Sequence, residues 1–318
     1  MAESKEELKS LLMKVKEKSV FYFAVPVFFI ITGITLMDYQ ERYSTKEYFK
    51  KRAVKVLIPY IFWSLMGAVY LVATHKVPLS IVTPKYIING LLSASEFVAY
   101  FWYFQPLFCV YLCIPLFAAI DKEKKNKAAR YILFVCFIVN ILIPFLNLGL
   151  SLGIEWPYTV AVGSGYLFLT WAGYYIYHNP PTIKQKIIIY ILAAIGLFVH
   201  IFGTYTMSLS YGGIIEFYKG YCNVPCIFYS FGIFVLLRDI AIRIEKSAGL
   251  KKLFVVMAKY SFSVYLLQWF VLSIIDDLKV FDIYSLLYRL LMPLPVYAVI
   301  MLIVFILRKI PVIRKLVP

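Results

Sequence analysis

The sequence predicts an all-α protein, a polytopic transmembrane helical bundle of about nine spans. Hydrophobic residues make up 62% of the chain, the mean hydropathy is +0.79 and only 16% of the residues are charged. An ordinary soluble domain needs more polar surface than this composition supplies. The apolar runs continue for about 20 residues, which is the length of a membrane-crossing helix, and they do not alternate like the strands of a membrane barrel.

The chain divides into a charged N-terminal segment over residues 1–19, a transmembrane domain over 20–310 and a basic tail over 311–318. Charges continue to Lys18 with no cleavage-type site, so the first segment is not a signal peptide. Each apolar run beyond it is near 30 Å long at about 1.5 Å per residue, and each ends at charged, Gly-rich or Pro-containing sequence. In order, the predicted spans cover residues 20–38, 56–74, 97–120, 131–150, 159–178, 187–207, 221–237, 255–275 and 286–307.

Cations are concentrated in every second connecting segment. The intervening segments hold only four of the 33 Lys and Arg residues. By the positive-inside rule the cation-rich segments and the C-terminus are cytoplasmic. The net charge of +16 therefore reflects topology, and nucleic-acid binding is rejected because no soluble basic domain remains. The cation-rich segments, which hold 22 Lys and Arg residues, are 41–55, 121–130, 179–186, 238–252 and the tail from residue 308.

This topology has a consequence at the other end of the chain. Nine spans and a cytoplasmic C-terminus put the N-terminal segment outside, although it carries five lysines. Short basic N-termini usually stay inside. We therefore expect that a further membrane span precedes residue 1.

The cysteines do not indicate a disulfide framework or a metal site. All five lie inside apolar runs, and although two pairs are spaced i, i+4, no His or carboxylate accompanies them. Thiolates at hydrocarbon depth are costly, so small packing residues are the better interpretation and no metal is expected.

A cationic patch lies just before the second span. Lys51, Arg52 and Lys55 lie at positions i, i+1 and i+4, so a helix brings Arg52 and Lys55 close together. Paired cations at the start of a helix can give several charge-assisted hydrogen bonds to a phosphate. The alternative is a topology signal with contacts to anionic lipid.

Two further candidates, Trp102 and Gln105, lie near the outer third of the third span, where Pro106 loosens the helix. A role in substrate binding is one interpretation. The other is an aromatic interface anchor for Trp102 and a bond to a neighbouring helix for Gln105.

Four segments of the chain stand out together. They are VFFIITG at 27–33, KRAVKVLIPY at 51–60, FWYF at 101–104 and KYSFSVYLL at 259–267. In this order they resemble an apolar run ending in Ser-Gly, an Arg-x-x-Arg segment followed by Pro, a His-x-Trp motif and a late Ser-Phe-x-x-Tyr-Leu segment. These are motifs of the integral-membrane acyltransferase family 3, which includes bacterial O-acetyltransferases of cell-surface glycans, and the resemblance covers roughly residues 20–310.

The resemblance implies a multi-pass protein of the bacterial plasma membrane, with ten spans and both termini in the cytoplasm. It implies an acyl-CoA, in the first instance acetyl-CoA, whose phosphates are held by Lys51, Arg52 and Lys55. The acceptor is then a hydroxyl of a polysaccharide of the cell envelope or of a lipid-linked sugar, bound near Trp102 and Gln105. The protein's partners are thus the lipid bilayer, the acyl-CoA and the glycan.

The chain departs from the family pattern at the catalytic residues. The family's histidine on the first span has no counterpart, and Tyr100 and Gln268 stand where family motifs have histidine. His75, His178 and His200 match no family position, so the catalytic base is unknown. Activity as an O-acyltransferase is expected if the missing span is supplied. The alternatives are a glycan transporter or export partner with the same fold, and a non-catalytic membrane scaffold.

Overall fold

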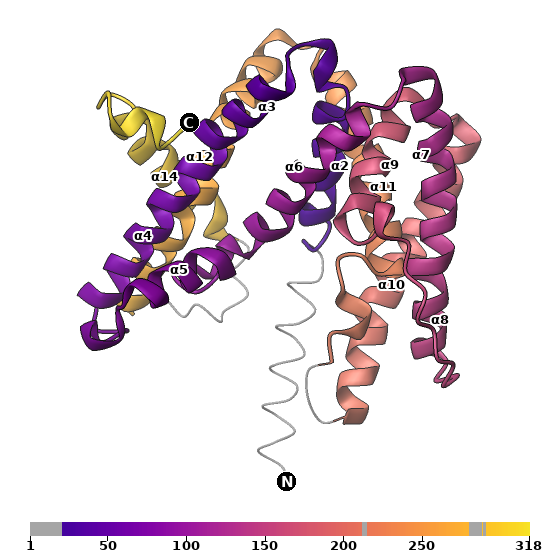
Figure 1. The fold of residues 1–318 in the computed structure, drawn as a ribbon, viewed down its shortest axis with the longest axis horizontal. Helices are drawn as coiled ribbons and strands as arrows, with labels where there is room; N and C mark the ends of the chain where they lie inside the picture. Colours follow the sequence, from indigo (N-terminus) through magenta and orange to yellow (C-terminus); the bar gives the residue numbers. More distant parts are fainter. Residues whose placement is uncertain (1–20, 212–214, 280–287, 289–290) are drawn as a thin grey trace. The chain divides into compact units, whose positions relative to one another are not determined.

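The structure is a computed structural model that describes residues 21–211, 215–279, 288 and 291–318. Within these ranges the chain forms helices and no β-strands, which confirms the all-α class (Figure 1). It divides into two compact units. The first joins the chain up to Arg42 with Leu112–Arg243, and the second joins Tyr43–Tyr111 with Ile244–Pro318.

The first unit combines helices of 7 to 29 residues. A π-helical turn over Phe137–Leu142 links α7 to α8, and a proline lies in the first turn of α8. The helices of this unit are α2 (Ala24–Leu36), α7 (Lys122–Cys136), α8 (Ile143–Gly149), α9 (Tyr166–His178), α10 (Ile183–Tyr211) and α11 (Val224–Ile244).

The second unit has a similar construction. A π-helical turn over Ala53–Leu57 joins α3 to α4, and α6 (Phe104–Ala118) begins in this unit and ends in the first. Its other helices are α3 (Thr45–Arg52), α4 (Ile58–Ala73), α5 (Pro84–Ser93), α12 (Ala248–Asp277) and α14 (Pro293–Leu307).

Each of the nine predicted spans overlaps a helix of the described chain, although residue 20 of the first span and residues 286, 287, 289 and 290 of the last lie outside the described residues. Six helical stretches are long and apolar enough to cross a membrane, and α2, α9 and α14 are shorter, with 13, 13 and 15 residues. The six long stretches are Thr45–Ala73, Ala99–Ala118, Lys122–Gly149, Ile183–Tyr211, Phe217–Ile244 and Ala248–Asp277.

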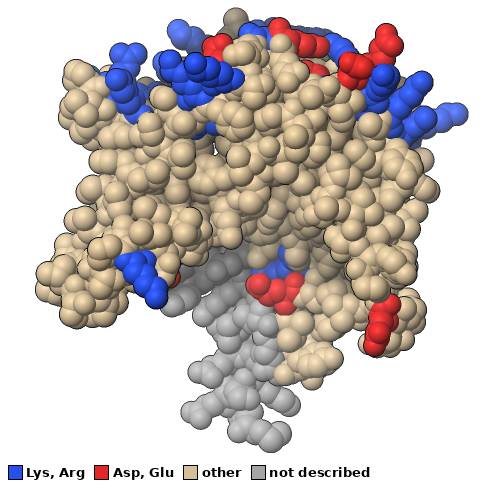
Figure 2. Space-filling model, viewed as in Figure 1, with Lys and Arg blue, Asp and Glu red and all other residues tan. Residues whose placement is uncertain are grey.

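The cation-rich segments that connect the predicted spans are largely helical. Residues 45–57 continue directly into α4, and α7 starts at Lys122 inside the cationic segment 121–130. Lys and Arg are good helix formers, so a helix can continue past its apolar part without a penalty. Figure 2 shows clusters of Lys and Arg side chains next to extended surfaces without charged residues.

Helices α2 and α9 of the first unit pack at backbone contact. A Cβ atom added to Gly33 would lie 1.9 Å from the carbonyl oxygen of Thr170, and one added to Gly173 would lie 2.0 Å from that of Ile30. Small residues permit this approach, which maximises dispersion contacts between helices in lipid. The short α2 is thereby fixed to α9.

We predict that Gly33→Ala destabilises the protein, because the new methyl group meets a backbone oxygen that cannot move aside. Overpacking of this kind costs roughly 1–3 kcal/mol. Thermal unfolding in detergent should show a lower midpoint. The control is Gly249→Ala in α12, where nothing lies within 4 Å of the added Cβ. An unchanged midpoint for Gly33→Ala would contradict the α2–α9 contact.

Topology gives a second prediction. After removal of the native cysteines, cysteines at the exposed positions Lys46 and Lys127 should be protected from an impermeant thiol reagent added outside. Cysteines at Ser80 and Ser210, which are also exposed, should react. External labelling at Lys127 would overturn the charge-based orientation.

Candidate functional site

The cationic patch lies where α3 passes through a π-helical turn into α4. Arg52 is the last residue of α3 and Lys55 lies within the π turn. A π turn holds one residue more than an α turn and is often found at functional sites. The regular α-helical spacing assumed for Arg52 and Lys55 therefore does not hold here.

Arg52 is the cation of the patch that packs between two tyrosine rings. Its half-buried guanidinium lies over the rings of Tyr48, at 5.9 Å, and Tyr111, at 5.5 Å. The Tyr48 hydroxyl donates a hydrogen bond of 3.0 Å to the carbonyl oxygen of Tyr111, which ties α3 to α6. Within the described chain the buried Nε of Arg52 has no hydrogen-bond partner. One donor of the guanidinium is therefore buried and unsatisfied within the described chain.

The two lysines of the patch differ from Arg52. Lys51 pairs with Glu47 at 2.9 Å and lies 3.8 Å above the Tyr43 ring, so part of its charge is already balanced. Lys55 is exposed. Of the three cations predicted to bind the acyl donor, Arg52 thus packs against two aromatic rings, whereas Lys55 is exposed.

Trp102 lies just before α6, and Gln105 lies in the first turn of this helix, which also carries Tyr111. Trp102 belongs to a 3₁₀ turn over Ala99–Tyr103 and is half-buried, whereas Gln105 is exposed. Tyr111 follows Gln105 by six residues, about 9 Å along an α-helix. Helix α6 thus connects the predicted acceptor residues to the ring that packs against Arg52.

Tyr100 and Gln268, the positions where the family motifs carry histidine, have structural partners. The carbonyl oxygen of Tyr100 accepts a hydrogen bond from the Tyr265 hydroxyl. Gln268 lines a cavity of about 320 Å³ between α12 and α14, whose walls are mainly apolar. Neither residue supplies a base.

The three histidines occupy separate environments. His75 is exposed just after α4 and adopts a left-handed backbone with φ of 56°. His200 is fully buried, and its Nδ1 lies 3.0 Å from the carbonyl oxygen of Tyr218. His178 ends α9 and belongs to a charged network.

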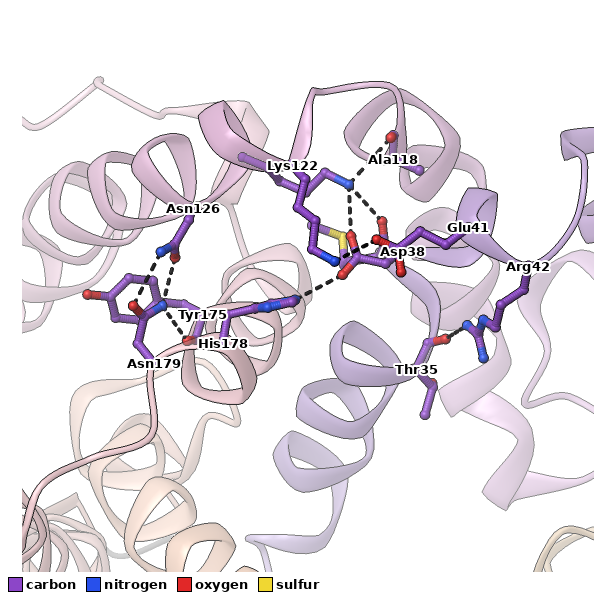
Figure 3. A network of polar contacts seen from close by, with 12 residues as sticks. Thr35, Asp38, Glu41, Arg42, Ala118, Lys122, Asn126, Tyr175, His178 and Asn179 are labelled. Atoms are coloured by element: carbon purple, nitrogen blue, oxygen red, sulfur yellow. Dashed lines mark hydrogen bonds and ion pairs between the residues drawn. The ribbon is translucent and has the colours of Figure 1, made fainter.

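That network is centred on Asp38 and joins polar side chains of the first unit, among which Lys125 is buried (Figure 3). Asp38 follows α2, and its two carboxylate oxygens contact Lys125 Nζ at 3.0 Å and His178 Nε2 at 2.9 Å. Lys125 is only 3% exposed and also donates to the carbonyl oxygens of Met37 and Ala118. The carboxylate therefore joins α2, α7 and α9.

An ion pair and a pair of amide hydrogen bonds lie beside this network. Lys122 pairs with Glu41 at 2.7 Å, and Asn126 exchanges amide hydrogen bonds with Asn179 at 3.2 and 2.7 Å. Burial raises the pKa of Asp38, but hydrogen bonds from Lys125 and His178 and the charges of both residues outweigh it, so the pKa lies below its usual value. Asp38 is therefore ionised at neutral pH and balances the buried lysine.

Sequence patterns do not predict this network. Asp38 is the last residue of the first predicted span, and Lys125 lies in the cation-rich segment 121–130. His178 is 140 residues from Asp38, and no spacing rule relates the two. The position of Asp38 directly after an apolar run was the only available signal.

The described residues include no group of three or more His, Cys, Asp or Glu side chains that could hold a metal ion. The patch around Arg52 presents hydrogen-bond donors that suit an anionic group, and both carboxylate oxygens of Asp38 are occupied by Lys125 and His178.

Comparison with known families decides the class. The family model described as an acyltransferase domain matches residues 4–308, which is nearly the whole chain. The chain belongs to acyltransferase family 3. Together with its six candidate spanning helices, this makes it a multi-pass membrane acyltransferase. No curated protein and no solved structure matches the chain significantly.

The family 3 assignment confirms the resemblance seen in the sequence motifs and runs through both compact units. It does not test the roles of Lys51, Arg52, Lys55, Trp102 and Gln105, which stay predictions. These five residues all lie in the second unit, and the Asp38 network lies in the first.

The network around Asp38 gives a prediction for stability. Asp38→Asn leaves the buried Lys125 without its counter-charge, which should cost on the order of 3 kcal/mol. Because the folded pKa of Asp38 is depressed, its stabilisation is present above the unfolded pKa of about 3.9 and is lost as pH falls through the folded value. The difference in unfolding midpoint between wild type and variant should therefore shrink below about pH 4.

The matched control is Asp121→Asn. Asp121 pairs with Lys124 at 3.3 Å, but the two side chains are 75% and 79% exposed, so its loss should change stability by less than about 1 kcal/mol. Equal effects of the two variants would show that burial does not strengthen the Asp38 network.

Proposed function

We propose that this family 3 protein transfers an acyl group, in the first instance acetyl, from cytoplasmic acyl-CoA to a hydroxyl of a cell-envelope glycan or a lipid-linked sugar. Family membership supplies the reaction class. The observation that carries the donor assignment is the fixed Arg52 guanidinium at the cation-rich end of the α3–α4 helix. The proposed location is the bacterial plasma membrane, with the C-terminus in the cytoplasm.

Arg52 suits a phosphate for three physical reasons. Its guanidinium is always charged and presents several donors in a plane. The Tyr48 and Tyr111 rings restrict its motion, so little conformational entropy is lost on binding. Lys55 nearby in the chain adds a mobile positive charge that can follow a second phosphate.

Helix α6 supports an acceptor site away from the phosphates. The pantetheine arm of CoA separates its phosphates from its thioester, so donor anchor and reaction centre need not coincide. Gln105 can exchange hydrogen bonds with sugar hydroxyls, and the half-buried Trp102 offers an aromatic face. Transfer to a hydroxyl also needs a proton acceptor with a pKa near neutrality, to which we assign no residue.

The second candidate function is a glycan transporter or export partner. Tyr100 and Gln268, which replace histidines of the family motifs, favour it. Supplying membranes with radiolabelled acetyl-CoA and a glycan acceptor separates the two candidates. Covalent label on the glycan supports the acyltransferase, whereas movement of unlabelled glycan without acylation supports the transporter.

We predict that Arg52→Ala weakens acyl-CoA binding roughly tenfold to a hundredfold, the effect of losing one charge-assisted hydrogen bond of about 1.5–3 kcal/mol. Isothermal titration of CoA into the detergent-purified protein measures this effect. The control is Lys50→Ala, which removes an exposed cation two residues away. If both variants bind CoA like wild type while remaining folded, Arg52 serves topology and not the donor.

A further inference from the structure

The second unit also contains a cavity lined by cations, at the end of α14. Its volume is about 420 Å³, within the range of about 300–1,000 Å³ that is typical of ligand pockets. Its walls combine four cations with two aromatic rings, contributed by Lys259, Tyr260, Phe305, Arg308, Lys309 and Arg314.

Arg308 is held rigidly at the centre of these contacts. Its Nε donates to the carbonyl oxygen of Val317 at 2.9 Å, and its Nη2 donates to the main-chain oxygens of Lys259 and Pro318 at 3.1 and 2.6 Å. The guanidinium also stacks on the Tyr260 ring at 4.3 Å. Its buried Nη1 has no hydrogen-bond partner within the described chain.

The other three cations are exposed and unbalanced. Lys259, Lys309 and Arg314 form no ion pair with any Asp or Glu of the described chain. Four like charges around one cavity repel each other, and an anion bound between them would relieve that repulsion. A phosphate oxyanion accepts such charge-assisted hydrogen bonds.

The surroundings of the cavity indicate a lipid as the source of the phosphate. Helix α14 leads away from it as an apolar helix whose side chains Leu302, Phe305 and Ile306 are 60%, 51% and 54% exposed. Phe305 belongs both to this surface and to the cavity wall. An acyl chain can lie along α14 while its headgroup occupies the cavity, because cations at the end of an apolar helix lie at the membrane interface.

We propose that this cavity is a binding site for the headgroup phosphate of an anionic phospholipid. The site is separate in sequence from the Arg52 patch and requires nothing of the proposed acyl-transfer function. Arg308 forms its fixed base, and Lys259, Lys309 and Arg314 form a mobile cationic rim.

The test compares two triple variants of the full chain in neutral detergent. The first, Lys259→Gln/Lys309→Gln/Arg314→Gln, removes the rim and keeps Arg308 with its structural bonds. The control, Lys251→Gln/Lys252→Gln/Lys315→Gln, removes three exposed cations near the same helix ends that do not line the cavity. Native mass spectrometry measures binding of phosphatidylglycerol, phosphatidylcholine and glycerol 3-phosphate, and thermal unfolding verifies the fold.

We expect the rim variant to bind phosphatidylglycerol about tenfold or more weakly than wild type. Each Lys or Arg close to an anionic lipid strengthens binding, and the variant lacks three of them. The control should change affinity less than about twofold. Wild type should prefer phosphatidylglycerol to phosphatidylcholine, and glycerol 3-phosphate should bind far more weakly.

Three outcomes would overturn the proposal. Equal losses in both triple variants would show a diffuse surface charge and no site. Equal affinity for glycerol 3-phosphate and phosphatidylglycerol would make the cavity a site for soluble phosphate esters. Loss of CoA binding in the rim variant, with lipid binding unchanged, would make it part of the donor site.

Discussion

The first unit depends on the backbone contact between α2 and α9. Gly33 and Gly173 lie against main-chain carbonyl oxygens of the opposite helix, and no side chain fits between them. This contact places the end of α2 beside the end of α9, so Asp38 can meet His178. It also explains how a helix of 13 residues holds its position, because its central residues Phe29 and Ile30 are fully buried.

The Asp38 network follows from that packing. A lysine that is 3% exposed is costly unless it is paired, and Asp38 supplies both the charge and one of its hydrogen bonds. The carboxylate has a second partner in His178, so it links three helices at their ends. Removing one member of the cluster would leave a buried charge unbalanced. The three helix ends are therefore held in one arrangement.

The second unit has two cationic sites at helix ends, and different groups hold the arginine in each. Around Arg52, tyrosine rings from α3 and α6 restrict the guanidinium. Around Arg308, main-chain oxygens do so, while the Trp63 indole donates to the Leu316 carbonyl oxygen at 2.9 Å and the Ser263 hydroxyl to the Pro318 oxygen at 2.7 Å. In both sites one arginine packs against other groups and exposed cations such as Lys55 or Lys309 lie near it in the chain, an arrangement suited to phosphate groups. The proposed ligands are an acyl-CoA at the Arg52 site and, beside the apolar surface of α14, an anionic phospholipid at the Arg308 site.

The sequence by itself determined the helical class, the nine apolar segments, the alternation of cationic segments and the family motifs, because these are local properties of composition and period. It placed Arg52 in a cationic patch for the same reason. It could not find the π turn that separates Arg52 from Lys55, nor the tyrosine rings around Arg52, one of which comes from 59 residues further along the chain. Only the tertiary structure paired Asp38 with His178 across 140 residues and gathered Lys259 and Arg314 around one cavity. Long-range contacts depend on how helices pack, and a residue's identity and its neighbours in sequence do not encode that packing in any spacing rule.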